Sequence, residues 1–136
     1  MNIFICASKH NYKHIPEIKN QLESVGHKIT LPNSFDDPFI ELRTKEESKE
    51  KHVNLKQKFF KDQVKKIEDN DVVLIVNFDK GEYKNYIGGA TFLEMYKAFE
   101  FGKKIFFYNP IPEGILEDEI VGMNPFVING DLSLIK

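Results

Sequence analysis

Short continuous runs of apolar residues alternate along this chain with segments whose apolar residues recur at helical spacing. The run from Ile3 to Ala7 ends at polar residues, which is typical of a strand buried on both faces. Val72 to Val76 is the clearest run of the same kind. We predict strands at these two runs and shorter strands at residues 27–31, 105–108 and 126–128.

Helices are predicted between these strands. Their amphipathic pattern covers residues 15–25, 55–68, 90–101 and 116–121. Strands that alternate with helices and lack hairpin turns indicate a parallel sheet with helices on both faces. We therefore expect an α/β fold with a single doubly wound, mostly parallel five-stranded sheet, in a flavodoxin-like or Rossmann-like arrangement.

The domain organisation is predicted to be simple. Residues 1–136 have the length of one domain with a single core. Within it, residues 41–54 are almost wholly polar or charged. Such a stretch has little apolar surface to bury, so we expect an exposed or mobile insertion there.

Composition excludes several classes of partner. The formal net charge of −2 gives no general attraction to nucleic acid or to an anionic membrane, so we expect neither as a partner. Cys6 is the single cysteine and lies in the first apolar run, where a buried, unreactive side chain is expected. No signal-peptide pattern opens the chain and no apolar run approaches the ~20 residues of a membrane span. We expect a cytoplasmic protein.

Polar and glycine-containing loops follow the predicted strands. The carboxyl ends of parallel strands meet at one edge of a sheet, where ligands bind in doubly wound folds. Glycines there let a ligand approach the backbone, and the start of a helix favours negative charge. The candidate binding residues at this edge are Ser8, His10, Asn77, Asn85, Tyr86, Gly88, Gly89, Thr91 and Asn109.

Two carboxylates, Glu94 and Asp79, are the candidate catalytic residues at this edge. A pair of carboxylates suits cleavage of a glycosidic bond, in which one attacks or stabilises the anomeric carbon and the other handles a proton. Two alternatives are open. Glu94 also forms a capping-box pattern with Thr91, and Asp79 also suits a turn before Gly81.

Other catalytic signatures are missing. The first strand is not followed by G-x-G-x-x-G, and no P-loop pattern or G-x-S-x-G elbow occurs. We therefore expect no cofactor. The histidines show no metal-ligand spacing with a supporting carboxylate, so no metal site is predicted.

The segment Thr91-Phe92-Leu93-Glu94-Met95-Tyr96-Lys97-Ala98, followed by Gly102-Lys103-Lys104-Ile105, resembles the nucleoside 2-deoxyribosyltransferase superfamily, which includes the deoxynucleoside monophosphate N-glycosidases. The first strand, the Asp71–Val76 run and Asp79 extend this resemblance over most of the chain. The superfamily pattern is a G-T-x-x-E-x-G-x-A helix opening and a G-K-P-like turn. The resemblance implies that Glu94 is a nucleophile that forms a glycosyl-enzyme, and that Asp79 binds substrate or handles a proton.

This chain also departs from the superfamily pattern. Gly88 stands six residues before Glu94, where these enzymes usually carry an Asp or Ser that holds the sugar or its phosphate. Tyr96 replaces a small residue after the glutamate. The chain therefore looks like a divergent branch. Members of the superfamily assemble as dimers or larger, so the resemblance implies a homodimer or higher homo-oligomer.

The leading hypothesis is an N-glycosidase or deoxyribosyltransferase that acts on a small-molecule nucleoside or nucleotide through Glu94. The alternative is a non-catalytic nucleotide-binding or sensor domain on the same fold, which the missing side chain at Gly88 favours. A third hypothesis makes Glu94 a structural cap in a protein-interaction domain whose contact surface is residues 41–54.

Overall fold

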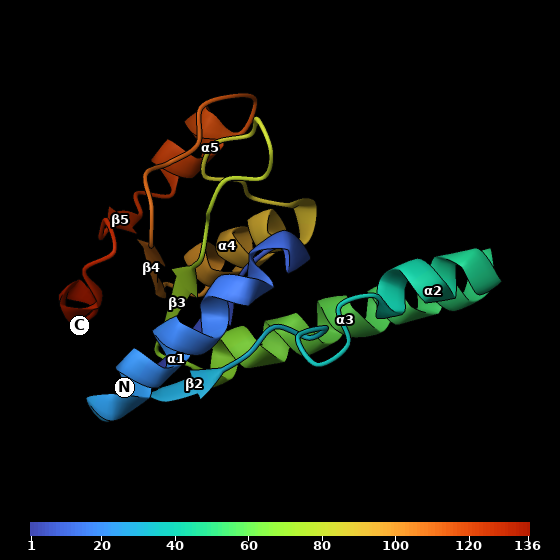
Figure 1. Cartoon of the computed structure of the whole chain (residues 1–136), viewed down its shortest axis with the longest axis horizontal. Coiled ribbons are helices and arrows are strands. Elements are labelled where there is room, and N and C mark those ends of the chain that lie inside the picture. Colours follow the sequence, from blue (N-terminus) through green and yellow to red (C-terminus); the bar gives the residue numbers. More distant parts are fainter.

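A five-stranded, all-parallel sheet forms the centre of the computed structural model, which describes all 136 residues. The strands lie in the order β2 (Lys28–Thr30), β1 (Asn2–Cys6), β3 (Val72–Ile75), β4 (Lys104–Phe107) and β5 (Phe126–Val127) (Figure 1). The connection from β1 leads to the edge strand β2, and the connection from β2 crosses back past β1 to β3 on its other side. The predicted α/β class and doubly wound parallel sheet are confirmed.

Helices cover both faces of the sheet because side chains alternate along each strand. Ile3 and Ile5 of β1 pack in one core cluster with α1 (Ile15–Ser24). Phe4 and Cys6 of the same strand pack in a second cluster on the opposite face. The helices of that second face are α3 (Lys49–Asp69), α4 (Gly89–Glu100) and α5 (Glu117–Gly122), and two short 3₁₀ helices, η1 (Lys9–His14) and η2 (Leu132–Leu134), complete the chain.

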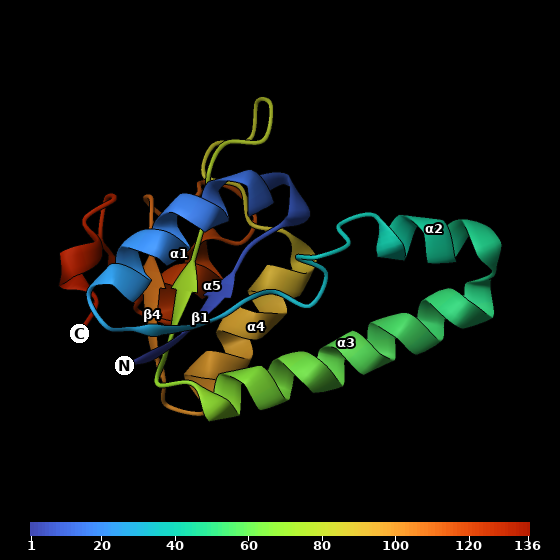
Figure 2. The same ribbon diagram turned by 60° about the horizontal axis from the view of Figure 1, so that its bottom comes forward.

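The charged insertion differs from its prediction. It is exposed, as expected, but it is helical: α2 (Ile40–Glu47) packs against α3, which begins at Lys49, six residues earlier than predicted. The Ser48 side chain accepts a hydrogen bond from the Lys51 N–H and so caps α3. Figure 2 shows α2 and the first turns of α3 extending away from the sheet. We call residues 40–62 the arm.

None of the helices combines the length and the apolar composition that a membrane crossing needs.

Candidate functional site

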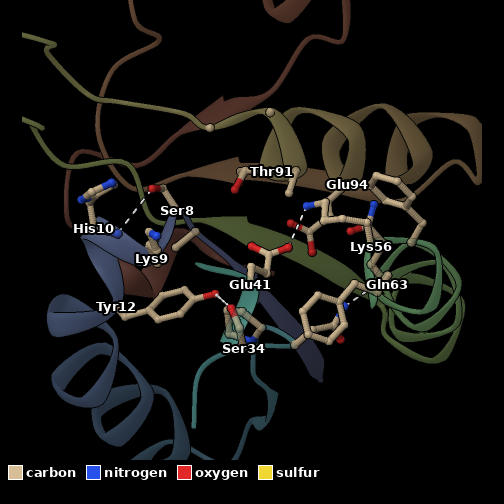
Figure 3. A pocket seen from close by; sticks show the side chains of 18 of the residues that line it. Ser8, Lys9, His10, Tyr12, Ser34, Glu41, Lys56, Gln63, Thr91 and Glu94 are labelled. Atoms are coloured by element: carbon tan, nitrogen blue, oxygen red, sulfur yellow. Dashed lines mark hydrogen bonds and ion pairs between the residues drawn. The ribbon is translucent and has the colours of Figure 1, made fainter. Parts of the chain in front are cut away.

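A cavity of about 260 Å³ lies where β1 ends, between the first turns of α4 and the side of α3. The switch in strand order occurs at β1, and this is where doubly wound sheets bind their ligands. Figure 3 shows polar side chains from both halves of the chain directed into the cavity. Its lining includes Ser8, Lys9, His10, Tyr12, Ser34, Glu41, Lys56, Phe59, Phe60, Gln63, Tyr86, Gly88, Gly89, Thr91 and Glu94.

Glu94 lies on the inner face of α4 and is only 6% exposed. The helix begins at Gly89 with Gly88 as its N-cap, and no side chain caps it. Thr91 is therefore inside the first turn and Glu94 is a turn further along. The capping-box interpretation is wrong, because the helix starts before Thr91 and leaves the Glu94 carboxyl group facing the cavity.

Burial controls the ionisation of Glu94. Removal of the carboxyl group from water raises its pKa to about 8, while the nearby Lys66 ammonium, the Cys6 thiol and Lys56 oppose this rise. Lys66 is held in place by a 2.8 Å hydrogen bond from its Nζ to the Leu31 carbonyl. The Glu94 carboxyl group is therefore mostly neutral at pH 7, and the nearby lysines favour its charged form.

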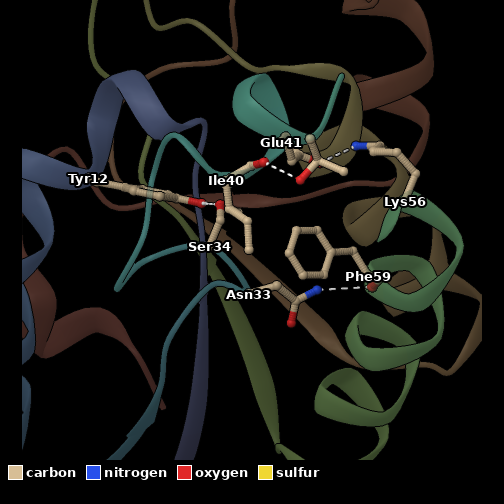
Figure 4. A network of polar contacts seen from close by, with 8 residues as sticks. Tyr12, Asn33, Ser34, Ile40, Glu41, Lys56 and Phe59 are labelled. Atoms are coloured by element: carbon tan, nitrogen blue, oxygen red, sulfur yellow. Dashed lines mark hydrogen bonds and ion pairs between the residues drawn. The ribbon is translucent and has the colours of Figure 1, made fainter. Parts of the chain in front are cut away.

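A polar network borders the cavity on the side of the arm (Figure 4). Lys56 Nζ lies 2.8 Å from Glu41 Oε1. The Tyr12 hydroxyl lies 2.8 Å from Ser34 Oγ, and burial raises the pKa of Tyr12 to about 12. Asn33 Nδ2 donates to the Phe59 carbonyl over 2.9 Å and joins the loop after β2 to α3. These contacts fix the position of the arm relative to the cavity.

Two further polar side chains line the cavity without partners in the chain. Gln63 is 6% exposed and Thr91 is 2% exposed, yet neither side chain makes a hydrogen bond to another residue. Neither is among the buried atoms shut off from all partners, which are Asn11 Oδ1 and His52 Nδ1. A buried amide or hydroxyl without a partner is costly, so these two groups are available to a ligand.

The predicted site residues separate into two groups. Those that line the cavity are Ser8, His10, Tyr86, Gly88, Gly89, Thr91 and Glu94. Those that lie outside it are Asn77, Asp79, Asn85 and Asn109. The predicted pair of carboxylates, Glu94 and Asp79, is therefore not brought together.

Asp79 has a local role in the loop after β3. Its Oδ1 accepts from the Asn85 N–H over 2.9 Å and its Oδ2 lies 3.2 Å from Lys84 Nζ. The Asn85 N–H and the Lys84 ammonium hold the pKa of Asp79 below its usual range. Asp79, Asn85 and Asn109 line a separate, shallow hollow with His14 and Phe78. This geometry matches the turn alternative for Asp79.

Asn77 and Asn109 bind each other. The Asn77 Nδ2 donates to the carbonyls of Asn109 and Pro110, and its Oδ1 accepts from the Asn109 N–H over 2.9 Å. Asn109 Nδ2 in turn donates to the Asn77 carbonyl over 3.0 Å. These bonds join the loops after β3 and β4, and they use the groups that were expected to meet a ligand.

The sequence interpretation missed Tyr12, Glu41, Lys56 and Gln63 as cavity residues. Part of this was detectable, because Lys56, Phe59 and Gln63 recur at the spacing of one helical face within the predicted helix over residues 55–68. Glu41 was not detectable, because its segment showed only a run of charge.

Comparisons by sequence give no match, either to a protein-family model or to a curated protein. Comparison by structure gives matches to solved structures, among them two enzymes. The 2-deoxyribosyltransferase from the psychrotolerant bacterium Bacillus psychrosaccharolyticus is 19% identical, with 85% of this chain and 77% of that chain covered and a TM-score of 0.58. The CMP N-glycosidase BcmB from Clostridium botulinum is 15% identical, with 94% of this chain and 88% of that chain covered and a TM-score of 0.55.

At these identities the likeness shows a shared fold. The resemblance inferred from sequence is therefore confirmed at the level of the fold.

Proposed function

We propose that this protein cleaves the base–sugar bond of a nucleoside or nucleotide, as an N-glycosidase or deoxyribosyltransferase, with Glu94 as the nucleophile. The observation that carries the proposal is that the Glu94 carboxyl group lines the cavity at the strand switch and is not bonded to its own helix. The fold shared with a 2-deoxyribosyltransferase and a CMP N-glycosidase supports this substrate class.

The proposed first step forms a bond between a Glu94 oxygen and the anomeric carbon of the sugar. The bond from that carbon to the base breaks, its electron pair stays on the base nitrogen, and this nitrogen takes a proton from water. Only the ionised form of Glu94 attacks. Lys66 and Lys56 favour that form, and loss of water from the cavity on substrate binding strengthens their effect.

The walls of the cavity suggest how the substrate lies. Phe59 and Phe60 on α3 offer aromatic surface for a base, and the Gln63 amide has both a donor and an acceptor for its edge. On the other side of Glu94, the free N–H groups at the start of α4 and the Ser8 hydroxyl suit the sugar and any 5′-phosphate. We leave Asp79 out of the reaction, because it binds Lys84 and Asn85 outside this cavity.

The test is incubation with 2′-deoxycytidine, 2′-deoxyadenosine, their 5′-monophosphates and CMP, followed by chromatography for free base. We expect base release that rises with pH as Glu94 ionises around pH 8. Glu94→Gln keeps the size of the side chain and removes the nucleophile, so we expect a loss of at least ~10³-fold in rate. Glu100→Gln is the matched control, because it makes the same change at the exposed end of α4. Undiminished base release by Glu94→Gln would refute the mechanism.

A second candidate function is non-catalytic nucleotide binding or sensing. Two observations favour it: Gly88 contributes no side chain to the cavity, and a pKa of about 8 leaves most Glu94 carboxyl groups protonated at pH 7. In that case the nucleotides raise the melting temperature without any release of base. A melting temperature that stays constant at millimolar nucleotide excludes this candidate.

We also propose that the protein forms a homodimer or higher homo-oligomer through the outer face of α4. Leu93, Tyr96 and Phe99 are each about half exposed there, one helical turn apart. A second copy with the same apolar face can cover this surface in a two-fold contact. Light scattering after size exclusion should give a multiple of 15.8 kDa, and Tyr96→Glu should shift it toward the monomer. A monomer at every concentration refutes the proposal.

A further inference from the structure

The cavity contains a second carboxylate, and it comes from the arm. Glu41 is the second residue of α2, and its Oε1 lies 2.8 Å from Lys56 Nζ on α3. Both side chains are about 30% exposed, at 31% and 29%, and both line the cavity that Glu94 lines. Figure 3 shows Glu41 and Glu94 directed toward the same space from opposite walls.

Lys56 and Tyr12 are electrostatic neighbours of both carboxylates. The Lys56 ammonium pairs with Glu41 and also lowers the pKa of Glu94 against the effect of burial. The charges of both Glu94 and Glu41 add to burial in raising the pKa of the Tyr12 hydroxyl. The charge of Lys56 therefore acts on both carboxylates.

The two carboxylates differ in their access to water. Glu94 is almost fully buried, whereas Glu41 faces both the cavity and the solvent. A group that takes a proton from a water molecule must afterwards release it to bulk solvent, which Glu41 can do. The Lys56 ammonium holds the Glu41 carboxylate in place beside the cavity.

We propose that Glu41 is the general base that activates water to hydrolyse the glycosyl-enzyme formed on Glu94. The proposal rests on the proposed function, and it assigns a residue on the arm to the step that makes the protein a hydrolase. Asp79 was the second carboxylate expected from the sequence, and Glu41 takes that place in the cavity.

Water replaces Glu94 at the anomeric carbon in this step. The oxygen of a water molecule attacks the carbon while one of its protons passes to Glu41. The bond between that carbon and the Glu94 oxygen breaks, and its electron pair restores the Glu94 carboxylate. Glu41 releases the proton to solvent, which compensates for the proton that the base took up in the first step. The products are the free base and the free sugar.

The experiment measures the formation and the hydrolysis of the glycosyl-enzyme separately in the Glu41→Gln variant. With enzyme in excess over the most rapidly cleaved nucleoside, base release in the first turnover should stay within a few-fold of the wild type. Steady-state turnover should fall by ~10² or more, because a lost general base costs about that factor. The intact protein mass should show an accumulated glycosyl adduct. Glu46→Gln is the matched control, because Glu46 is an exposed carboxylate of α2 that does not line the cavity.

Sodium azide provides a second test, since azide attacks the anomeric carbon without losing a proton. It should restore turnover in Glu41→Gln and yield the glycosyl azide, but it should not rescue Glu94→Gln. The inference is overturned if Glu41→Gln turns over at the wild-type rate, or if its first turnover is lost while its melting temperature is unchanged. Those results leave Glu94 as nucleophile intact. Absence of base release by the wild type overturns the proposed function first and this inference with it.

Discussion

Burial makes the Glu94 carboxyl group costly to ionise, and this cost is linked to the stability of the fold. The ordinary pKa of such a group is 4.5, and in the folded protein burial raises it to about 8. Between these two values the folded chain holds a proton that the unfolded chain releases. The group therefore contributes stability that is fully present below about pH 4.5 and is lost as the pH rises through about 8.

We predict that Glu94→Gln removes this part of the pH dependence. The free energy of unfolding of the wild type should fall relative to the variant by a few kcal/mol between pH 5 and pH 9, since each tenfold change in an acid dissociation constant corresponds to about 1.4 kcal/mol. Urea denaturation of both proteins over this range measures the difference. All other groups titrate equally in both chains, so parallel curves would show that the folded protein leaves the pKa of Glu94 at its ordinary value.

Glu94 was identifiable from sequence because it follows a buried strand and a glycine-containing loop. In a parallel sheet, a residue at that point of the chain lies at the edge where ligands bind. Its partners were not identifiable. Whether Asp79 faces a ligand or its own loop depends on Lys84 and on the Asn85 N–H, five and six residues later in the chain. Contacts of this kind within a loop leave no periodic pattern in the sequence.

The start of α4 decides which way Glu94 points. Gly88 is the N-cap with a φ of −81°, a conformation open to any residue. A Cβ atom built at Gly88 has Ser8 Cβ as its nearest neighbour at 3.7 Å, which is ordinary contact distance. A serine at this position can therefore cap the helix without disturbing the cavity wall.

We predict that Gly88→Ser is more stable than Gly88→Ala by about 1 kcal/mol, because only the serine hydroxyl can accept from the free N–H groups of the first turn. Both variants restrict the unfolded chain to a similar extent, so their difference isolates the cap. Urea denaturation at pH 7 gives both values. Equal stabilities would contradict the assignment of Gly88 as the N-cap.

The arm is the element that sequence patterns described least well. Charge dominates residues 41–54, so the pattern showed exposure but not the two helices or the return of Glu41 to the cavity. The capping of α3 by Ser48 fixes where α2 ends, and the position of Glu41 follows from the packing of α2 on α3. Packing between exposed helices is set by shape and ion pairs, which hydrophobic periodicity does not encode.

The sheet, in contrast, was predictable throughout. The three central strands, β1, β3 and β4, are short apolar runs buried on both faces, and helices between parallel strands leave few topologies. The same reasoning predicted a ligand edge at the carboxyl ends of the strands. It could not predict that the edge is divided into the cavity at β1 and the hollow beside β4.

The bonds between Asn77 and Asn109 join the loops after β3 and β4, and they lead to a prediction for the molecule as a whole. Asn77→Ala removes three hydrogen bonds and leaves the Asn109 N–H without its partner, so we expect a loss of about 2–3 kcal/mol in the free energy of unfolding. Asn54→Ala, an exposed change on α3, is the control and should stay within about 0.5 kcal/mol. Since Asn77 does not line the cavity, nucleoside affinity measured well below the melting temperature should change only a few-fold. A variant with normal stability and a loss of affinity above tenfold would instead place Asn77 in the binding site, as the sequence alone suggested.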